Sequence, residues 1–128
     1  MVIILIHWMI KHGYEQNFLD TWNSMSIDTD SGFYKESLAT PVDGAGDPRY
    51  QTFSIQSPHY TTYINIGSWS SLGHFEKAIQ KYFPVNRAST DGKQIIEMED
   101  FEFKLRERIV LRVVSERNPK EHNNSKSS

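Results

Sequence analysis

The chain has 128 residues, enough for one domain with a core of its own. Its formal net charge is −2 and it lacks a dense run of lysine and arginine, which argues against a nucleic acid or an anionic membrane as partner. It has no cysteine, which excludes disulfides and thiolate metal sites and fits the reducing cytoplasm, where we expect the protein to reside.

The chain begins with an apolar stretch at residues 2–10, in which both alternating faces are apolar apart from His7. This pattern predicts a strand that is covered on both faces. The stretch is too short to cross a bilayer and lacks the preceding basic residues of a signal peptide. His7 is either a hydrogen-bonded core residue or the strand histidine that could serve as a base.

Residues 14–25 place four apolar side chains, Trp22 among them, on one stripe, which predicts an amphipathic helix. Trp22 either packs in the core or also lines a cavity. Residues 33–38 predict a second, less apolar strand near a sheet edge. Residues 41–58 form a long insertion rich in turn residues, which is either a functional flap or a tolerated loop.

Residues 60–69 are rich in β-branched and aromatic side chains and predict a strand, and the residues after Trp69 have helical spacing. Side chains alternate across a strand, so Tyr63, Asn65 and Trp69 share one face. Asn65 and Trp69 would stand about 13 Å apart on a straight strand, a span that suits a flat multi-ring ligand.

The remainder of the chain supplies one more strand. Residues 95–101 fit a short helix or a strand equally well, whereas residues 107–115 predict a strand. Residues 118–128 contain no apolar side chain able to anchor them, so we expect a disordered tail after a single domain at residues 1–117.

The order strand, helix, strand, strand, helix, strand is typical of the ferredoxin-like α+β fold, with a four-stranded antiparallel sheet and both helices on one face. The first and third strands are then central. The first strand is apolar on both sides, so its other face needs cover, and a second copy of the sheet would supply it. We therefore expect a homodimer.

The βαββαβ order, the two-sided first strand and the stretch Ile-Asn-Ile-Gly-Ser-Trp at residues 64–69, with a helix starting just after it, resemble the antibiotic biosynthesis monooxygenase family of dimeric α+β barrels. The resemblance covers residues 2–115 apart from the insertion. The asparagine four residues before the tryptophan resembles the pattern of the polyketide anthrone oxygenases of that family. Those enzymes use no metal or flavin. The family's helix tyrosine would fall near Phe75, which lacks the hydroxyl, and its basic residue near Arg87.

This resemblance implies oxidation of a small phenol, anthrone or quinol by O2 with no cofactor. Donors in a water-poor cavity would stabilise the substrate anion or the peroxide, and Asn65 and Trp69 could supply them. We name His7 as the candidate base. The substrate would lie against Tyr63, Phe75, Trp22 and Arg87. A packing role for Asn65 and Trp69 is the alternative.

Two other functions stay open. A haem-binding or haem-degrading protein of the same fold would use a histidine on the second helix, where His74 lies close to the start. A dimeric domain that binds a small molecule without catalysis is the other. The sequence contains no His-Glu-x-x-His motif, glycine-rich phosphate loop or nucleophile elbow, so we expect no metal site and no serine hydrolase.

Overall fold

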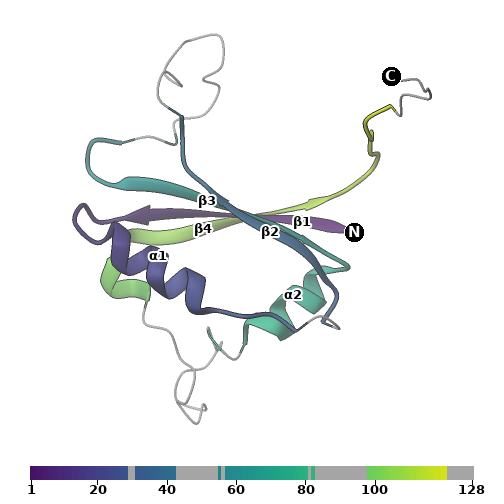
Figure 1. Ribbon diagram of the computed structural model, residues 1–128, viewed down its shortest axis with the longest axis horizontal. Helices are drawn as coiled ribbons and strands as arrows, with labels where there is room; N and C mark the ends of the chain where they lie inside the picture. The colour runs from purple at the N-terminus through teal and green to yellow at the C-terminus, as the bar shows by residue number, and fades with distance from the viewer. Residues whose placement is uncertain (29–30, 43–54, 56, 81, 83–97, 121–128) are drawn as a thin grey trace, which may run out of the picture.

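Four antiparallel strands form one sheet in the order β2-β3-β1-β4, and both helices lie on one side of it (Figure 1). The computed structural model describes residues 1–28, 31–42, 55, 57–80, 82 and 98–120. The elements in chain order are β1 (Val2–Ile10), α1 (Glu15–Ser24), β2 (Phe33–Ala39), β3 (Thr61–Trp69), α2 (Leu72–Ile79), the 3-10 turn η2 (Met98–Phe101) and β4 (Glu102–Arg112). The predicted ferredoxin-like α+β fold is confirmed, with β1 and β3 in the centre.

The two central strands pair along their whole length. Residues Val2 to Ile10 of β1 face Trp69 to Thr61 of β3 without a register shift. β4 pairs with the other edge of β1, and its register shifts on either side of Met9. β2 pairs with β3 with a register shift between Phe33 and Lys35. The central pair is therefore the regular part of the sheet, and the irregular pairing occurs at the two edge strands.

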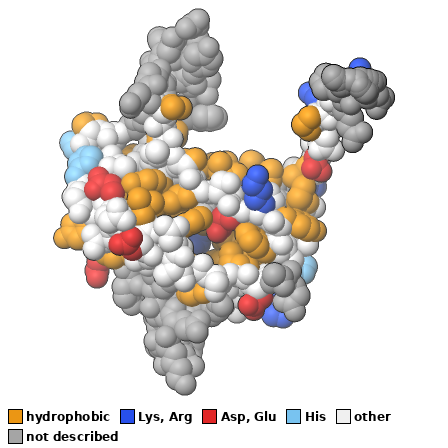
Figure 2. Space-filling model, viewed as in Figure 1, with side chains coloured by type: hydrophobic (Ala, Val, Ile, Leu, Met, Phe, Trp, Pro, Cys, Tyr) orange, Lys and Arg blue, Asp and Glu red, His pale blue; other side chains and the backbone are white. Residues whose placement is uncertain are grey.

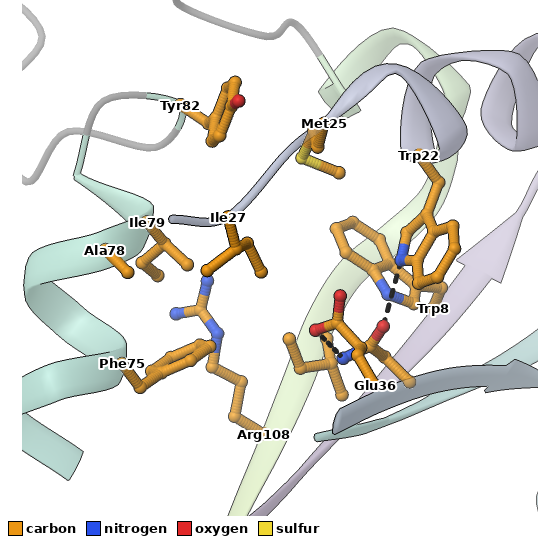
Figure 3. Close-up of a pocket in the computed structure, with 12 residues that line it drawn as sticks. Trp8, Trp22, Met25, Ile27, Glu36, Phe75, Ala78, Ile79, Tyr82 and Arg108 are labelled. Carbon is orange, nitrogen blue, oxygen red and sulfur yellow. Dashed lines mark hydrogen bonds between the residues drawn. The ribbon is translucent and has the colours of Figure 1, made fainter. Parts of the chain in front are cut away.

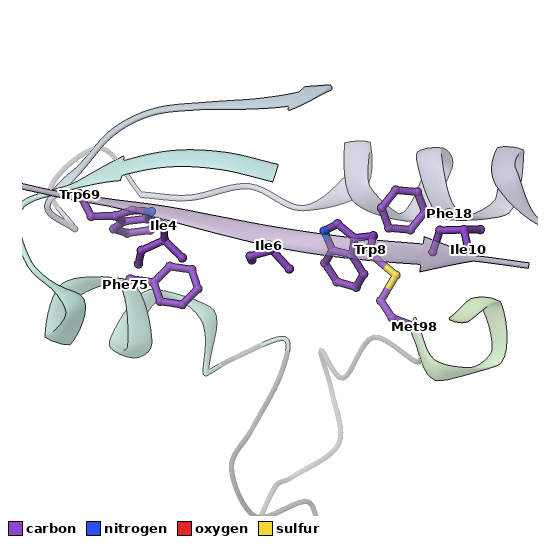
Figure 4. Close-up of a cluster of buried hydrophobic side chains, with 8 residues drawn as sticks. All are labelled: Ile4, Ile6, Trp8, Ile10, Phe18, Trp69, Phe75 and Met98. Atoms are coloured by element: carbon purple, nitrogen blue, oxygen red, sulfur yellow. The ribbon is translucent and has the colours of Figure 1, made fainter. Parts of the chain in front are cut away.

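The core lies between the sheet and the helices. Ile4, Ile6, Trp8 and Ile10 of β1 project toward the helices in one row (Figure 4). Trp69 and Phe75 close one end of this row, and Phe18 and Met98 close the other (Figure 4). Alternation along a strand thus produces the continuous apolar layer that the helices cover.

The last strand differs from the sequence prediction. We expected it at residues 107–115, but β4 begins at Glu102 and ends at Arg112. Its first residues alternate weakly in hydropathy, because Glu102 turns inward to pair with Arg106 while apolar Phe103 stays half exposed. Of the segment that fitted helix or strand, residues 98–101 form a 3-10 turn.

The predicted insertion and tail fall largely outside the described residues, at 43–54, 56 and 121–128. Both stay predictions. Within the described part of the chain, no helix is long and apolar enough to cross a membrane.

The face of the sheet opposite the helices is apolar and carries no helix among the described residues (Figure 1). Leu5 in its centre lies between Ile66 of β3 and Ile109 of β4. Ile66 is 40% exposed and Ile109 is 55% exposed. We call this surface the outer face.

Glu102 and Arg106 form an almost buried ion pair at the start of β4. The Arg106 side chain donates to Glu102 from Nε at 3.1 Å and from Nη2 at 2.7 Å, and its guanidinium lies 4.8 Å from the centre of the Trp8 ring. The Arg106 side chain is only 9% exposed and the Glu102 side chain only 3% exposed. Each charge depends on the other, because an unpaired buried ion is strongly unfavourable.

Replacing Glu102 should therefore destabilise the fold. We expect Glu102→Gln to lower the free energy of unfolding by about 3 kcal/mol, because it removes the negative charge that faces the nearly buried Arg106 guanidinium. Chemical denaturation measures this. Glu107→Gln, on the same strand with a side chain that is 62% exposed, is the control and should change stability by less than about 0.5 kcal/mol. Equal effects of the two substitutions would contradict the account of the pair.

Candidate functional site

A cavity lies between the sheet and the two helices. Hydrophobic side chains gather around this hollow (Figure 2). Its atom-free space is about 540 Å³, part of it open to solvent, whereas the centre of a water molecule can reach only about 50 Å³. A multi-ring ligand would therefore have to widen it. We call it the inner cavity; it is lined by Ile6, Trp8, Trp22, Met25, Ile27, Glu36, Asn65, Phe75, Ala78, Ile79, Tyr82 and Arg108 (Figure 3).

The wall of the inner cavity is mostly aromatic and aliphatic, with three polar groups that can act on a ligand. These are the Glu36 carboxylate from β2, the Asn65 amide from β3 and the Arg108 guanidinium from β4. An apolar pocket with a few converging polar groups is the usual form of a small-molecule site.

Asn65 holds two sides of the cavity together. Its Oδ1 accepts a hydrogen bond of 2.9 Å from Trp22 Nε1, and its Nδ2 donates one of 2.9 Å to Glu36 Oε2 (Figure 3). The residue is 2% exposed, so these bonds offset the cost of burying its amide. They fix the orientation of the amide and leave one N–H of Nδ2 as a further donor.

Glu36 is a carboxylate with a perturbed proton affinity. Burial raises its pKa above the ordinary 4.5, and the hydrogen bond from Asn65 opposes part of that rise. A carboxylate with a raised pKa is a better proton acceptor than an exposed one. It is thus the candidate base of the inner cavity.

Trp69 does not line the inner cavity. It is fully buried, with its ring centroid 5.0 Å from that of Phe33 and 5.4 Å from that of Phe75. Its Nε1 has no hydrogen-bond partner among the described residues. The shared strand face with Asn65 is as expected, but aromatic packing separates the indole from the cavity that Asn65 borders.

Gly67 lies between the two residues on that face. A Cβ at this position would stand 3.0 Å from Trp69 Nε1 and 3.5 Å from Glu36 Oε2. The lack of a side chain here leaves the indole N–H and the carboxylate beside one small space. A larger residue would force one of them to move.

His7 lies on the outer face, away from the inner cavity. It pairs in the sheet with Glu107, and its Nδ1 is 3.9 Å from the Glu107 carboxylate. Its Nε2 is buried without a partner among the described residues. Burial lowers its pKa, while Glu107 raises it and Lys104 lowers it. His7 cannot reach a ligand in the inner cavity from this position.

The structure brings two of the four expected substrate-binding residues to the cavity. Trp22 and Phe75 line it. Tyr63 instead stacks on Phe18 with the ring centroids 5.1 Å apart, and its pKa is raised, first by burial and then by Glu15. Arg87 lies outside the described residues.

Sequence reasoning missed Glu36 and Arg108. Glu36 lies in an edge strand whose inward side chains are not uniformly apolar, so alternation did not single it out. Arg108 shares a strand face with Val110 and Arg112, an arrangement that the sequence does display. A charge in such a row is the available signal, and Arg108 lies within the predicted strand at residues 107–115, but alternation alone does not tell which face of the strand meets the helices.

The described residues contain no group of three histidine, cysteine, aspartate or glutamate side chains able to hold a metal ion. None of the four described histidines lines the inner cavity. The His74 Nδ1 lies 2.6 Å from Ser71 Oγ, and its ring packs against Gly32. The described residues therefore offer no histidine ligand for a haem in this cavity.

The fold and the site together define a ferredoxin-like α+β protein with an aromatic cavity beneath its helices. Among solved structures it resembles a mutant of MhuD that has two manganese protoporphyrin IX molecules bound per active site. The TM-score is 0.60 at 14% identity, over 93% of this chain and 100% of that one. At this identity the likeness shows the fold alone. No family model and no curated protein sequence matches the chain significantly.

The raised pKa of Glu36 predicts a pH-dependent effect on stability. The folded state holds the proton of Glu36 more tightly than the unfolded chain does, so its contribution to stability falls as pH rises from the unfolded pKa through the folded one. We expect Glu36→Gln to melt near the wild-type temperature at pH 4 and above it at pH 7, as measured by circular dichroism.

Glu15→Gln provides the opposite control for this experiment. A hydrogen bond from Thr61 is the main cause of the lowered pKa of Glu15, so the wild type gains stability from this group as pH rises. The Glu15 variant should therefore lose stability relative to the wild type between pH 3 and pH 7. A Glu36 variant that follows the same direction would contradict the burial of that carboxylate.

Proposed function

We propose that the protein binds a small aromatic molecule in the inner cavity and oxidises it with O2 without a cofactor. The observation that carries this proposal is the Glu36 carboxylate, which faces an aromatic cavity, has a raised pKa and is oriented by the buried Asn65 amide. The stretch at residues 64–69 and the fold support kinship with the antibiotic biosynthesis monooxygenases as part of the same proposal.

The proposed reaction begins with proton transfer to Glu36 from an acidic O–H or C–H group of the substrate. The electron-rich anion then gives one electron to O2, and the resulting radical and superoxide combine to a peroxide. When the peroxide collapses, an activated CH2 group becomes a carbonyl and the second oxygen atom leaves as water. The four electrons that reduce O2 come from the CH2 carbon, which loses its two C–H bonds as it becomes the carbonyl, and its two hydrogens leave in the water, so no other reductant is needed.

Asn65 has two parts in this scheme. Its hydrogen bond to Glu36 orients the base, and the bond from Trp22 prevents the amide from turning. Its remaining N–H is the donor that we assign to the developing negative charge. We assign the Trp69 N–H an indirect role, because it lies outside the inner cavity and approaches the Gly67 backbone close to the Glu36 carboxylate.

Porphyrin binding is the second candidate, because the structural neighbour MhuD is described with manganese protoporphyrin IX in its active site. The residues around the inner cavity fit this role less well. His74 is turned toward Ser71 and Gly32, and the sequence between residues 83 and 97 contains no histidine. A dimeric binding domain without catalysis remains the third candidate, and measurement of oxygen uptake separates it from the first.

Oxygen uptake with a panel of anthrones, quinols and naphthols tests the main proposal. We expect Glu36→Gln to lower the turnover rate about a hundredfold or more, because it keeps the size and the hydrogen bond from Asn65 but cannot accept the proton. Lys35→Gln, on the exposed opposite side of the same strand, should leave turnover unchanged. Oxygen uptake that is equal in both variants would contradict the proposed base.

We also propose that the protein is a homodimer joined through its outer face, and, from the absence of cysteine, that it is cytoplasmic. Leu5, Ile66 and Ile109 form an apolar surface on the sheet that the described residues leave uncovered. A second copy of the same face would bury it with matching symmetry.

Charge placed on the outer face should separate the dimer without unfolding the chain. Because Ile66 and Ile109 are exposed in the single chain, we expect Ile66→Glu and Ile109→Glu to keep their circular dichroism spectra but to sediment as monomers at micromolar concentration. Val114→Glu, which is 82% exposed beyond the end of β4, should sediment like the wild type. A monomeric wild type would refute the dimer.

A further inference from the structure

Arg108 connects the inner cavity to a second depression. It pairs with Ile6 in the sheet and lines the inner cavity, with its side chain extending past Phe75 toward Ile27 and Ile79 (Figure 3). It also lines a groove that we call the outer groove, bounded by Leu72, Gly73, Phe75, Glu76, Lys77, Ile79, Gln80, Arg108 and Val110. Arg108 therefore lies at the mouth of the site.

The guanidinium of Arg108 has no hydrogen bond or ion pair within the described part of the chain. Arg106, two residues earlier, is in contrast held by two bonds to Glu102 and by the Trp8 ring. Burial is the main cause that lowers the pKa of Arg108, with Arg106 adding to it, although the residue as a whole is exposed. Glu102 and Glu76 oppose the shift only as more distant charges.

Lys77 of α2 adds a second cation to the outer groove, beside Glu76. Among the described residues, the outer groove thus offers two cations to one anion. A guanidinium that is partly removed from water and has no partner in the described part of the chain is suited to a planar carboxylate, which it can bind through two parallel hydrogen bonds.

Glu36 and Arg108 stand on opposite walls of the inner cavity. They lie on β2 and β4, the two edge strands, so three strand spacings, about 14 Å, separate their backbones across the sheet. Both side chains project from the helix side of the sheet and line the cavity, so the gap between their charged ends is shorter than the gap between their backbones. The two charges do not pair with each other, so a ligand between them can meet both.

From this arrangement we propose that the ligand is a hydroxylated aromatic acid, bound with its carboxylate at Arg108 and its hydroxyl at Glu36. This inference rests on the proposed function and narrows its substrate class. The aromatic rings would lie between Trp22 and Phe75, and the acid group would reach the outer groove.

Calorimetric titration with matched naphthalene compounds tests this substrate class. The probes are a hydroxynaphthoic acid with its two substituents at opposite ends of the rings, its methyl ester, and the naphthoic acid without the hydroxyl. We expect the wild type to bind the hydroxy acid about tenfold or more tightly than the ester, because only the acid forms charge-assisted bonds with Arg108. Loss of the hydroxyl should also weaken binding, through Glu36.

Three variants locate the effect. Arg108→Gln should bind the acid and the ester equally, and Arg108→Lys should retain part of the preference because it keeps the charge. Arg112→Gln is the matched control, since Arg112 lies on the same strand face but lines neither the cavity nor the groove. It should keep the full preference. Circular dichroism of each variant verifies that the fold is intact.

The binding of the three compounds to the wild-type protein is the main test of this inference. Equal binding of the acid and the ester, or binding of none of the three compounds, overturns it, as does a preference that survives Arg108→Gln. Oxygen uptake measured on the same compounds separates this inference from the proposed oxidation. Acid-selective binding without oxygen uptake would support the proposed ligand class and refute the proposed oxidation. Equal oxidation of the acid and the ester would support the oxidation and refute the ligand class.

Discussion

The buried amide of Asn65 is the contact on which the site depends. Through Trp22 it attaches helix α1 to the centre of the sheet, and through Glu36 it attaches the edge strand β2. Burying an amide to 2% exposure is strongly unfavourable unless it is hydrogen-bonded. The Asn65 amide therefore needs the Trp22 indole and the Glu36 carboxylate as partners. The same two bonds that satisfy the amide join the residues of one wall of the inner cavity, and the bond to Glu36 opposes part of the rise in pKa that burial causes in this carboxylate.

The residues of strand β1 have different roles on the two sides of the sheet. Its inward residues form the core and the floor of the inner cavity, while its outward residues, Leu5 among them, belong to the outer face. His7 is the polar member of the outward row. Its nearby Glu107 lies on that face too, so His7 does not belong to the lining of the inner cavity, which has carboxylate, amide and guanidinium groups among the described residues.

The sequence predicts the fold well because its central strands have strong patterns. Two-sided hydrophobicity identifies β1, and β-branched residues identify β3, which together fix the sheet and its central pair. Edge strands have weaker patterns, since one side of each is exposed and inward polar residues are tolerated there. This is why β4 was placed five residues late and why Glu36 and Arg108, both on edge strands, were not recognised.

Within the candidate site, alternation correctly places Asn65 and Trp69 on one strand face. It does not tell which of the two borders the cavity and which is enclosed by other side chains. Phe75 from α2 packs against Trp69 and encloses it, whereas the space over Asn65 stays open. Whether a side chain borders a cavity depends on how the helices cover the sheet. That is a property of tertiary packing, which single-sequence periodicity does not contain.

The close approach of two side chains to Gly67 also limits how this site can diversify. A Cβ there would stand 3.0 Å from Trp69 Nε1 and 3.5 Å from Glu36 Oε2. Substitutions that change the ligand preference are therefore disfavoured at Gly67. They are better tolerated on α2, where Ala78 and Ile79 line the cavity away from the hydrogen bonds of Asn65. In a library built for altered specificity, position 67 would act as an invariant anchor and the helix as the adjustable surface.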